Sequence, residues 1–129
     1  MMAFKMEIKK TNTSPYVLID EENSYIQFEG ESFLEDAISF FKEINDWLRE
    51  YLHSDFTDLT FDCGMDYFNS STTKQIYNML RIMDRYAPGK DVVVNWIVKS
   101  PENDILIECG EDFREEMENL EFNIVISNS

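Results

Sequence analysis

Four consecutive hydroxyl side chains, Ser70 to Thr73, form the stretch of this sequence that is richest in potential chemistry. They follow Asn69 and precede Lys74, where a strand-like pattern changes into a helical one. Asn and Ser are preferred N-caps, so one interpretation is structural: one of these side chains accepts a backbone N–H bond. One cap does not need four hydroxyls, however, and a helix N-terminus also stabilises a bound phosphate. The run predicts either a simple cap or a phosphorylation site.

Other residue types that commonly act in catalysis give little support to an enzyme. His53 is the one histidine and stands at the polar end of a helical pattern, where we expect a surface or cap residue. Cys63 and Cys109 match no metal-ligand spacing, and we expect buried free thiols. Glycine-rich phosphate loops and calcium loops are absent from the sequence, and its acidic clusters are typical of a solvated face. We expect no catalytic residue, no metal site and no cofactor.

The formal net charge of −15 limits the choice of partners. A negative field repels phosphate backbones and anionic lipids, which argues against nucleic acid and membranes as partners. It favours a basic protein surface, although solubility alone also explains the charge. The N-terminal sequence lacks a signal-peptide pattern and no segment is apolar enough to span a membrane, so we expect a cytoplasmic protein.

The hydrophobic periodicity of the sequence predicts the strands and helices that position these residues. The length of the chain is typical of one domain, over 1–129. Residues 1–14 read as a polar arm, flexible over 1–12. We expect strands at 16–19, 25–30, 59–63, 92–98 and 122–126, and helices over about 32–52, 70–87 and 101–117. This ββαβαβαβ order predicts an α/β fold: a mixed sheet with helices packed on it and an antiparallel hairpin at its start.

Three local predictions accompany this order. Ser32 and Glu35 have the spacing of a capping box for the first helix. Ser100 before Pro101 reads as the cap of the last helix, in which Gly110 weakens the interior. The apolar run Val92–Val98 predicts a central strand beside 59–63, covered on both faces.

The whole chain, from about Thr13 to Ile126, resembles the SiaC family of regulatory phosphoproteins, whose fold is similar to the anti-sigma-factor antagonists (STAS-like). The resemblance depends on the order and spacing of several short stretches. These are Thr13-Ser14-Pro15, Gly30-Glu31-Ser32-Phe33-Leu34-Glu35, Phe40-Phe41, Trp47-Leu48 with Tyr51-Leu52, Tyr67-Phe68-Asn69-Ser70-Ser71, Trp96, and Glu108-Cys109-Gly110-Glu111-Asp112-Phe113.

The resemblance implies a bacterial signalling switch without catalytic activity of its own. In the family, a dedicated protein kinase phosphorylates the hydroxyl after the Asn of the strand-to-helix turn, and a PP2C-type phosphatase removes the phosphate. The unmodified form binds and activates a diguanylate cyclase, which links the switch to cyclic-di-GMP and biofilm control. Carried over, the phosphoacceptor falls on Ser70. The pattern of the anti-sigma-factor antagonists points instead to Ser71.

Three classes of function remain for the structure to weigh. The leading one is a phosphorylation-controlled binding module whose partner surface centres on Tyr67, Asn69, Ser70, Ser71 and Lys74, because apolar surface and unused N–H donors suit an interface. The second is a constitutive adaptor of the same fold. The third is an enzyme that acts through carboxylates and a metal ion.

Overall fold

The chain folds as one mixed sheet with helices on one side, as a computed structural model describes for residues 3–127. The elements of this part are β1 (Lys5–Ile8), β2 (Tyr16–Asp20), β3 (Tyr25–Ser32), α1 (Ala37–Leu52), β4 (Asp58–Phe68), α2 (Ser70–Tyr86), β5 (Asp91–Val98), α3 (Asp104–Glu116) and β6 (Glu121–Ile126). The sheet order is β1-β2-β3-β4-β5-β6, so sequence neighbours are also neighbours in space. The β1–β2 and β2–β3 pairs are antiparallel, and the β3–β4, β4–β5 and β5–β6 pairs are parallel. The predicted mixed sheet and its initial hairpin are confirmed.

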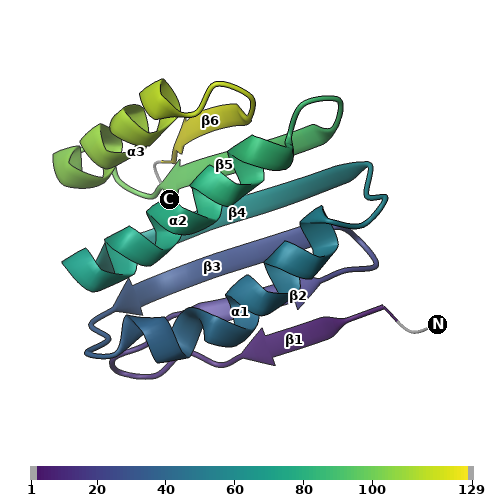
Figure 1. Cartoon of the computed structure of the whole chain (residues 1–129). Coiled ribbons are helices and arrows are strands. Elements are labelled where there is room, and N and C mark those ends of the chain that lie inside the picture. Colours follow the sequence, from purple (N-terminus) through teal and green to yellow (C-terminus); the bar gives the residue numbers. More distant parts are fainter. Residues whose placement is uncertain (1–2, 128–129) are drawn as a thin grey trace.

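The helices cover one face of the sheet because each of them connects a strand to the next parallel strand on the same side, from β3 toward β6. In a right-handed β-α-β connection, the face of the sheet on which the helix lies depends on the direction in which the chain moves across the sheet. Here that direction is the same for all three connections, so all three helices lie on one face. Figure 1 shows α1, α2 and α3 in front of the strands. The prediction that Val92–Val98 is covered on both faces is therefore wrong: its alternate residues are buried and half-buried. The strand is nevertheless interior to the sheet, with β4 on one side and β6 on the other.

The face without helices is held by polar side chains instead of a second apolar layer. Tyr25 Oη donates to Asp62 Oδ2 at 2.7 Å, and Asn95 Nδ2 donates to Asp62 Oδ1 at 2.8 Å. Asn123 Nδ2 continues the chain to Asn95 Oδ1 at 3.1 Å. Burial, followed by the bond to Asp62, raises the pKa of Tyr25 far above its usual value. This ladder ties the four parallel strands β3, β4, β5 and β6 together across an open surface.

The core lies between the other face of the sheet and the helices. Phe28 in β3 packs against Phe61 in β4 and Phe41 in α1, with ring centroids 4.9 and 5.6 Å apart. The fully buried side chains Ile76, Met79, Leu80 and Met83 recur at helical spacing along α2. This packing fixes α1 and α2 side by side over the central strands.

The N-terminal segment differs from the flexible arm that the sequence predicts for residues 1–12. Residues 5–8 form β1, which pairs antiparallel with β2 in the register Met6–Ile19 and Ile8–Val17. Phe4 stacks on Trp47 of α1 with 6.2 Å between ring centroids. The domain thus includes a sixth strand, and its order is βββαβαβαβ. Met1 and Met2 lie outside the described residues.

Two helices begin later than their predicted caps. Asp36, not Ser32, caps α1: its Oδ1 accepts from Ser39 N at 3.1 Å. Ser32 still belongs to β3 and is fully buried. Likewise Asn103, not Ser100, caps α3, and the Ser100 carbonyl accepts the Asn103 N–H in a preceding turn. In both cases a side chain three or four residues further along replaces the first candidate.

Candidate functional site

The hydroxyl run opens α2 at the carboxyl end of β4, and Asn69 organises it. Asn69 Oδ1 accepts the backbone N–H of Thr72 at 3.1 Å, which makes Asn69 the N-cap. Its Nδ2 donates to the Leu34 carbonyl at 2.9 Å, and its own N–H donates to the Ser32 carbonyl at 3.1 Å. Asn69 therefore caps α2 and holds the loop before α1 against it.

The four hydroxyls are not equivalent. Thr72 is fully buried and shares a 2.6 Å hydrogen bond with Ser32 Oγ. Thr73 Oγ1 donates to the Asn69 carbonyl at 2.9 Å, and Ser71 Oγ lies 3.1 Å from Asn69 Oδ1 and 3.2 Å from the Leu34 carbonyl. The Ser70 hydroxyl is exposed, and none of the hydrogen bonds within residues 3–127 involves it. Ser70 is the hydroxyl that a modifying enzyme can reach without breaking the cap.

Ser70 lines an open pocket of about 420 Å³ between the starts of α1 and α2. Glu35 and Asp36 line it from the α1 side, and Ser71 and Lys74 from the α2 side. Hydrogen bonds from the Ser39 hydroxyl and the Ser39 N–H hold the pKa of the Asp36 carboxyl below its usual value. Lys74 stands four residues after Ser70, which places both on one face of α2. A charge added to Ser70 thus meets one cation and two acidic side chains.

Two aromatic side chains are exposed shortly before the starts of α1 and α2. Tyr67, at the end of β4, stacks on Phe33 of the loop before α1, with centroids 4.8 Å apart, and each is 45% exposed. A stacked pair that stays half in solvent is typical of interface aromatics, which combine large area with few rotatable bonds.

Of the predicted partner surface, Ser70, Ser71 and Lys74 line the pocket between α1 and α2, and Asn69 caps α2. Tyr67 instead lines a smaller hollow on the α3 side of α2. Sequence reasoning missed Phe33, Glu35 and Asp36, which reach the same surface from the start of α1. It also missed Gln75, a buried polar residue of α2 that lines the pocket. The sequence signal for the α1 side was the aromatic and acidic group after Gly30, which we interpreted as a capping box and as part of the resemblance to the SiaC family.

The residues considered for catalysis lie elsewhere. His53 is the exposed C-cap of α1, where its Nδ1 contacts the Arg49 carbonyl and its Nε2 the Tyr86 hydroxyl, both at 2.7 Å. Cys63 is buried and Cys109 half-buried, both as free thiols. Burial raises the pKa of Cys63 to about 12 and that of Cys109 to about 11, so neither thiol forms a nucleophilic thiolate at neutral pH.

Two further findings concern the described part of the chain. Among residues 3–127, no group of three or more His, Cys, Asp or Glu side chains is placed to bind a metal ion. None of the helices there combines the length and apolarity needed to cross a membrane.

A mixed sheet with one helix layer, an Asn-capped hydroxyl run at a strand-to-helix turn and an exposed aromatic pair together characterise this small α/β domain. The SiaC family of regulatory phosphoproteins matches residues 8–127, and the chain belongs to that family. A protein of Pseudomonas aeruginosa whose role is uncharacterised is 24% identical over 112 residues, covering 86% of this chain and 88% of the relative.

The solved structures agree on the fold. SiaC of Pseudomonas aeruginosa superposes with a TM-score of 0.83 at 22% identity, covering 96% of this chain and 98% of that one. A structure of the diguanylate cyclase SiaD in complex with its activator SiaC, from the same organism, gives a TM-score of 0.82 at 24% identity, with 95% and 98% covered.

Proposed function

We propose that this protein is a phosphorylation-controlled binding module. A Ser/Thr kinase modifies Ser70, a PP2C-type phosphatase removes the phosphate, and the unmodified form binds and activates a diguanylate cyclase. The chain itself does no catalysis. The single observation that carries the choice of site is the exposed Ser70 hydroxyl, free of hydrogen bonds within residues 3–127, at the first position of α2. Family membership and the relative crystallised with a diguanylate cyclase support the class of partner.

The electrostatics of the pocket explain how a phosphate would switch the surface. Phosphorylation adds about −1.5 to −2 charges to a chain already at −15. Lys74 and the α2 N-terminus favour the phosphate, whereas Glu35 and Asp36 on the opposite wall repel it. The phosphate therefore turns toward α2 and solvent, over the surface that the unmodified protein offers to its partner. It covers Lys74 and adds bulk beside Tyr67.

Ser70 is preferred to Ser71 for a local reason. The Ser71 hydroxyl lies against both Asn69 Oδ1 and the Leu34 carbonyl, so its phosphorylation would remove these contacts and loosen the cap. Modification at Ser70 leaves the cap in place. After co-expression with the native kinase, phosphopeptide mapping should find phosphate on Ser70. Phosphate confined to Ser71, or to a residue outside α2, would contradict this assignment.

The binding step is tested by calorimetric titration with a purified diguanylate cyclase of the same organism. Wild type and Ser70→Ala should bind with equal affinity, and the phosphorylated protein about a hundredfold more weakly. Ser70→Asp should lie between them, because one carboxylate carries half the charge of a phosphate dianion. The cyclase assay should follow the same order.

The matched control is Thr57→Asp, an exposed hydroxyl before β4 at the opposite end of that strand. It adds the same charge away from the pocket and should leave affinity unchanged. Equal affinity for unmodified and phosphorylated protein would favour a constitutive adaptor instead. No binding by any form would reject the cyclase as partner.

A further inference from the structure

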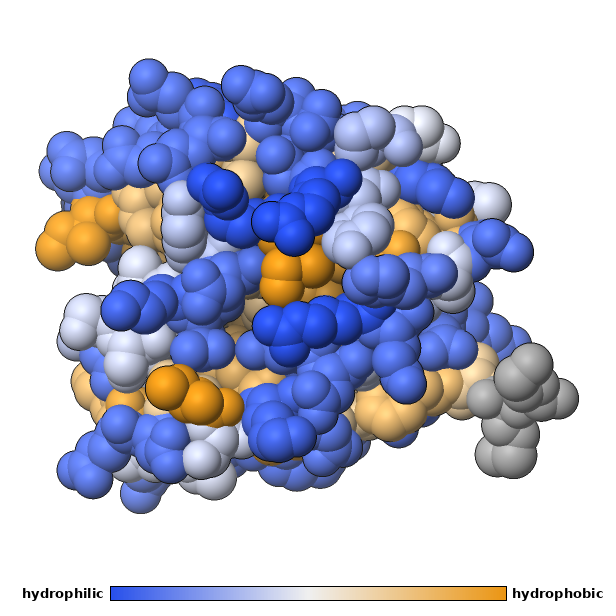
Figure 2. All heavy atoms as spheres, viewed as in Figure 1, coloured by the Kyte–Doolittle hydropathy of each residue, from blue (hydrophilic) through white to orange (hydrophobic). Residues whose placement is uncertain are grey.

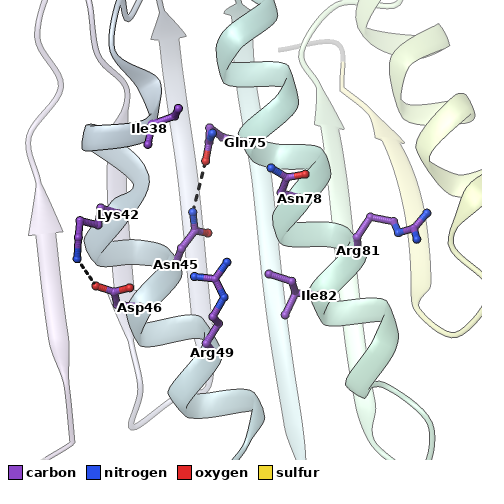
Figure 3. A pocket seen from close by; sticks show the side chains of 9 residues that line it. All are labelled: Ile38, Lys42, Asn45, Asp46, Arg49, Gln75, Asn78, Arg81 and Ile82. Carbon is purple, nitrogen blue, oxygen red and sulfur yellow. Dashed lines mark hydrogen bonds and ion pairs between the residues drawn. The ribbon is translucent and has the colours of Figure 1, made fainter.

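A groove between α1 and α2 continues from the Ser70 pocket along the helix layer. It holds about 530 Å³, and Ile38 and Gln75 line both hollows, so the two are continuous. Figure 3 shows Asn45 and Arg49 of α1 and Gln75 and Ile82 of α2 in the space between the two helices, whereas the Arg81 side chain extends toward the other side of α2. In Figure 2 the same face is largely hydrophilic, with an apolar patch near its centre. The groove is thus lined by apolar and cationic side chains, and it ends at the pocket that contains the proposed phosphoacceptor Ser70.

The charge of this groove is opposite to that of the molecule. Lys42, Arg49 and Arg81 line it and Lys74 stands at its Ser70 end, which places four of the eleven basic residues here. The same two hollows hold three carboxylates, Asp46 in the groove and Glu35 and Asp36 at the Ser70 end. Lys42 is paired with Asp46 at 2.9 Å. The guanidinium of Arg49 makes no ion pair within residues 3–127, and Arg81 bonds only to the Tyr77 hydroxyl, at 3.2 Å. Two arginines are therefore available to carboxylates of a partner.

Polar and apolar groups in the groove also lack partners. Asn45 donates to Gln75 at 3.4 Å, but its buried Oδ1 accepts no hydrogen bond within residues 3–127. A buried acceptor without a donor is costly, so a donor brought by an occupant, or by Arg49 on binding, would stabilise the site. Ile38 is 73% exposed at the junction of the two hollows. Burial of such a side chain favours association.

We propose that this groove binds an acidic amphipathic helix of the partner whose binding Ser70 controls; the proposal rests on the function proposed above. Helices form both walls, so no free strand edge is available for an extended peptide, whereas a helix satisfies its own backbone. α1 and α2 have 16 and 17 residues, which gives a track about 25 Å long. The carboxylates of the occupant pair with Arg49 and Arg81, and its apolar face covers Ile38 and Ile82. A phosphate on Ser70 puts negative charge at the end of this track and repels the acidic helix.

Calorimetry with a purified diguanylate cyclase of the same organism tests the groove. Arg49→Glu and Arg81→Glu should each weaken binding about tenfold or more, because each replaces an attraction by a repulsion. Arg114→Glu is the control: it makes the same charge change at an exposed arginine of α3, and binding should change less than about twofold. Equal losses for all three variants would assign the effect to the overall field and overturn the proposal.

A pair of exposed isoleucines separates the two sides of α2. Ile38 and Ile105 both occupy the second position of a helix, and they are 73% and 81% exposed. Ile105 lines a smaller hollow beside Tyr67 on the α3 side. Ile38→Ser should weaken binding several-fold, and Ile105→Ser should not. The reverse result would place the partner between α2 and α3 and overturn the groove.

The class of occupant is tested with synthetic peptides of about 20 residues that cover the helices of the cyclase outside its catalytic domain. One acidic peptide should shift NMR signals of α1 and α2, and its Gln/Asn counterpart should not. If wild type binds the cyclase but no peptide shifts these signals, the groove is wrong while the proposed function stands. If wild type does not bind the cyclase at all, both fall.

Discussion

Trp96 is the residue through which the last helix is attached to the sheet. Its Nε1 donates to the Leu106 carbonyl of α3 at 2.9 Å, and its ring is almost fully buried. Phe113 of α3 packs edge-on at 5.5 Å, and Phe68, the residue before the α2 cap, at 5.8 Å. The same indole therefore supports α3 and the residue that leads into the Ser70 turn.

Gly110 is needed because of this indole, not because of a turn. A Cβ at position 110 would lie 2.5 Å from Trp96 Cδ1 and 2.7 Å from Nε1. We expect Gly110→Ala to destabilise the fold by about 1–3 kcal/mol, since overpacking outweighs the roughly 1 kcal/mol of helix propensity gained. Urea unfolding followed by Trp fluorescence measures this. Asn78→Ala, on the exposed side of α2, is the control and should change stability little; a more stable Gly110→Ala protein would contradict the prediction.

The buried Ser32–Thr72 pair couples the end of β3 to the first turn of α2. Thr72→Val keeps the shape but leaves the Ser32 hydroxyl buried without a partner, and should cost about 1–3 kcal/mol. Adding Ser32→Ala removes that orphaned hydroxyl, so the double variant should recover part of the loss. A double-mutant cycle from urea unfolding gives the coupling energy, and strictly additive losses would show that the pair does not interact.

At the scale of elements, the N-cap residue of α2 also binds the loop before α1. Asn69 both accepts the Thr72 N–H and donates to the Leu34 carbonyl, whereas Asn103 of α3 caps without such a link. Asn103→Ala should therefore cost about 1 kcal/mol, and Asn69→Ala distinctly more. Thermal or urea unfolding of the two matched variants compares them. Equal losses would mean that the bond to Leu34 adds no stability.

The cap of α1 should give a pH dependence. The pKa of Asp36 is lowered by its bonds to Ser39, so the group contributes stability that is complete above the unfolded-state pKa of about 4 and is lost as pH falls through the folded-state value. Wild type should exceed Asp36→Asn in stability at about pH 6, and the difference should shrink toward about pH 3. Asp55→Asn controls for the loss of a charge. A difference that does not change with pH would assign no role to the carboxylate.

The helices and strands with long apolar periodicity were predicted correctly from the sequence, whereas the residues at which α1 and α3 begin were not. Phe41, Ile44 and Leu48 define α1 whatever its first residue is, but Ser32 was drawn into the sheet by its bond to Thr72, and Asp36 replaced it as cap. β1 is short and has charged Lys5 and Glu7 on its open side, so its pattern becomes clear only when β2 lies beside it. The Asn69-capped turn before α2 was predictable because its signal is local. The groove was not, because it depends on how two distant helices pack.

At the scale of the whole molecule, acidic residues outnumber basic ones by 26 to 11, and the basic residues are unevenly distributed over the surface. Within residues 3–127 the ion pairs are three, all with exposed side chains, and such pairs contribute little each. Three of the eleven basic residues are in these pairs, and of the other eight, Arg49 and Arg81 line the α1–α2 groove and Lys74 lines the pocket at its end. α3 and the turn after it carry many carboxylates. Repulsion among the acidic residues is thus the larger electrostatic contribution, and the groove is where we propose that an acidic helix of the partner binds.

This balance predicts that added salt stabilises the protein. Raising NaCl from about 0.01 M to about 0.15 M shortens the screening length from about 30 Å to about 8 Å, which weakens long-range repulsion more than the few short ion pairs. The melting temperature should rise by a few degrees, as expected for about 1 kcal/mol. In the control Glu111→Lys/Glu115→Lys, the net charge changes by 2 × 2 from −15 to −11, while the pair four residues apart on α3 still carries like charges. Its melting temperature should depend less on salt. If salt lowers the melting temperature of the wild type, or shifts both proteins equally, attractive pairs and not net repulsion govern its electrostatic stability.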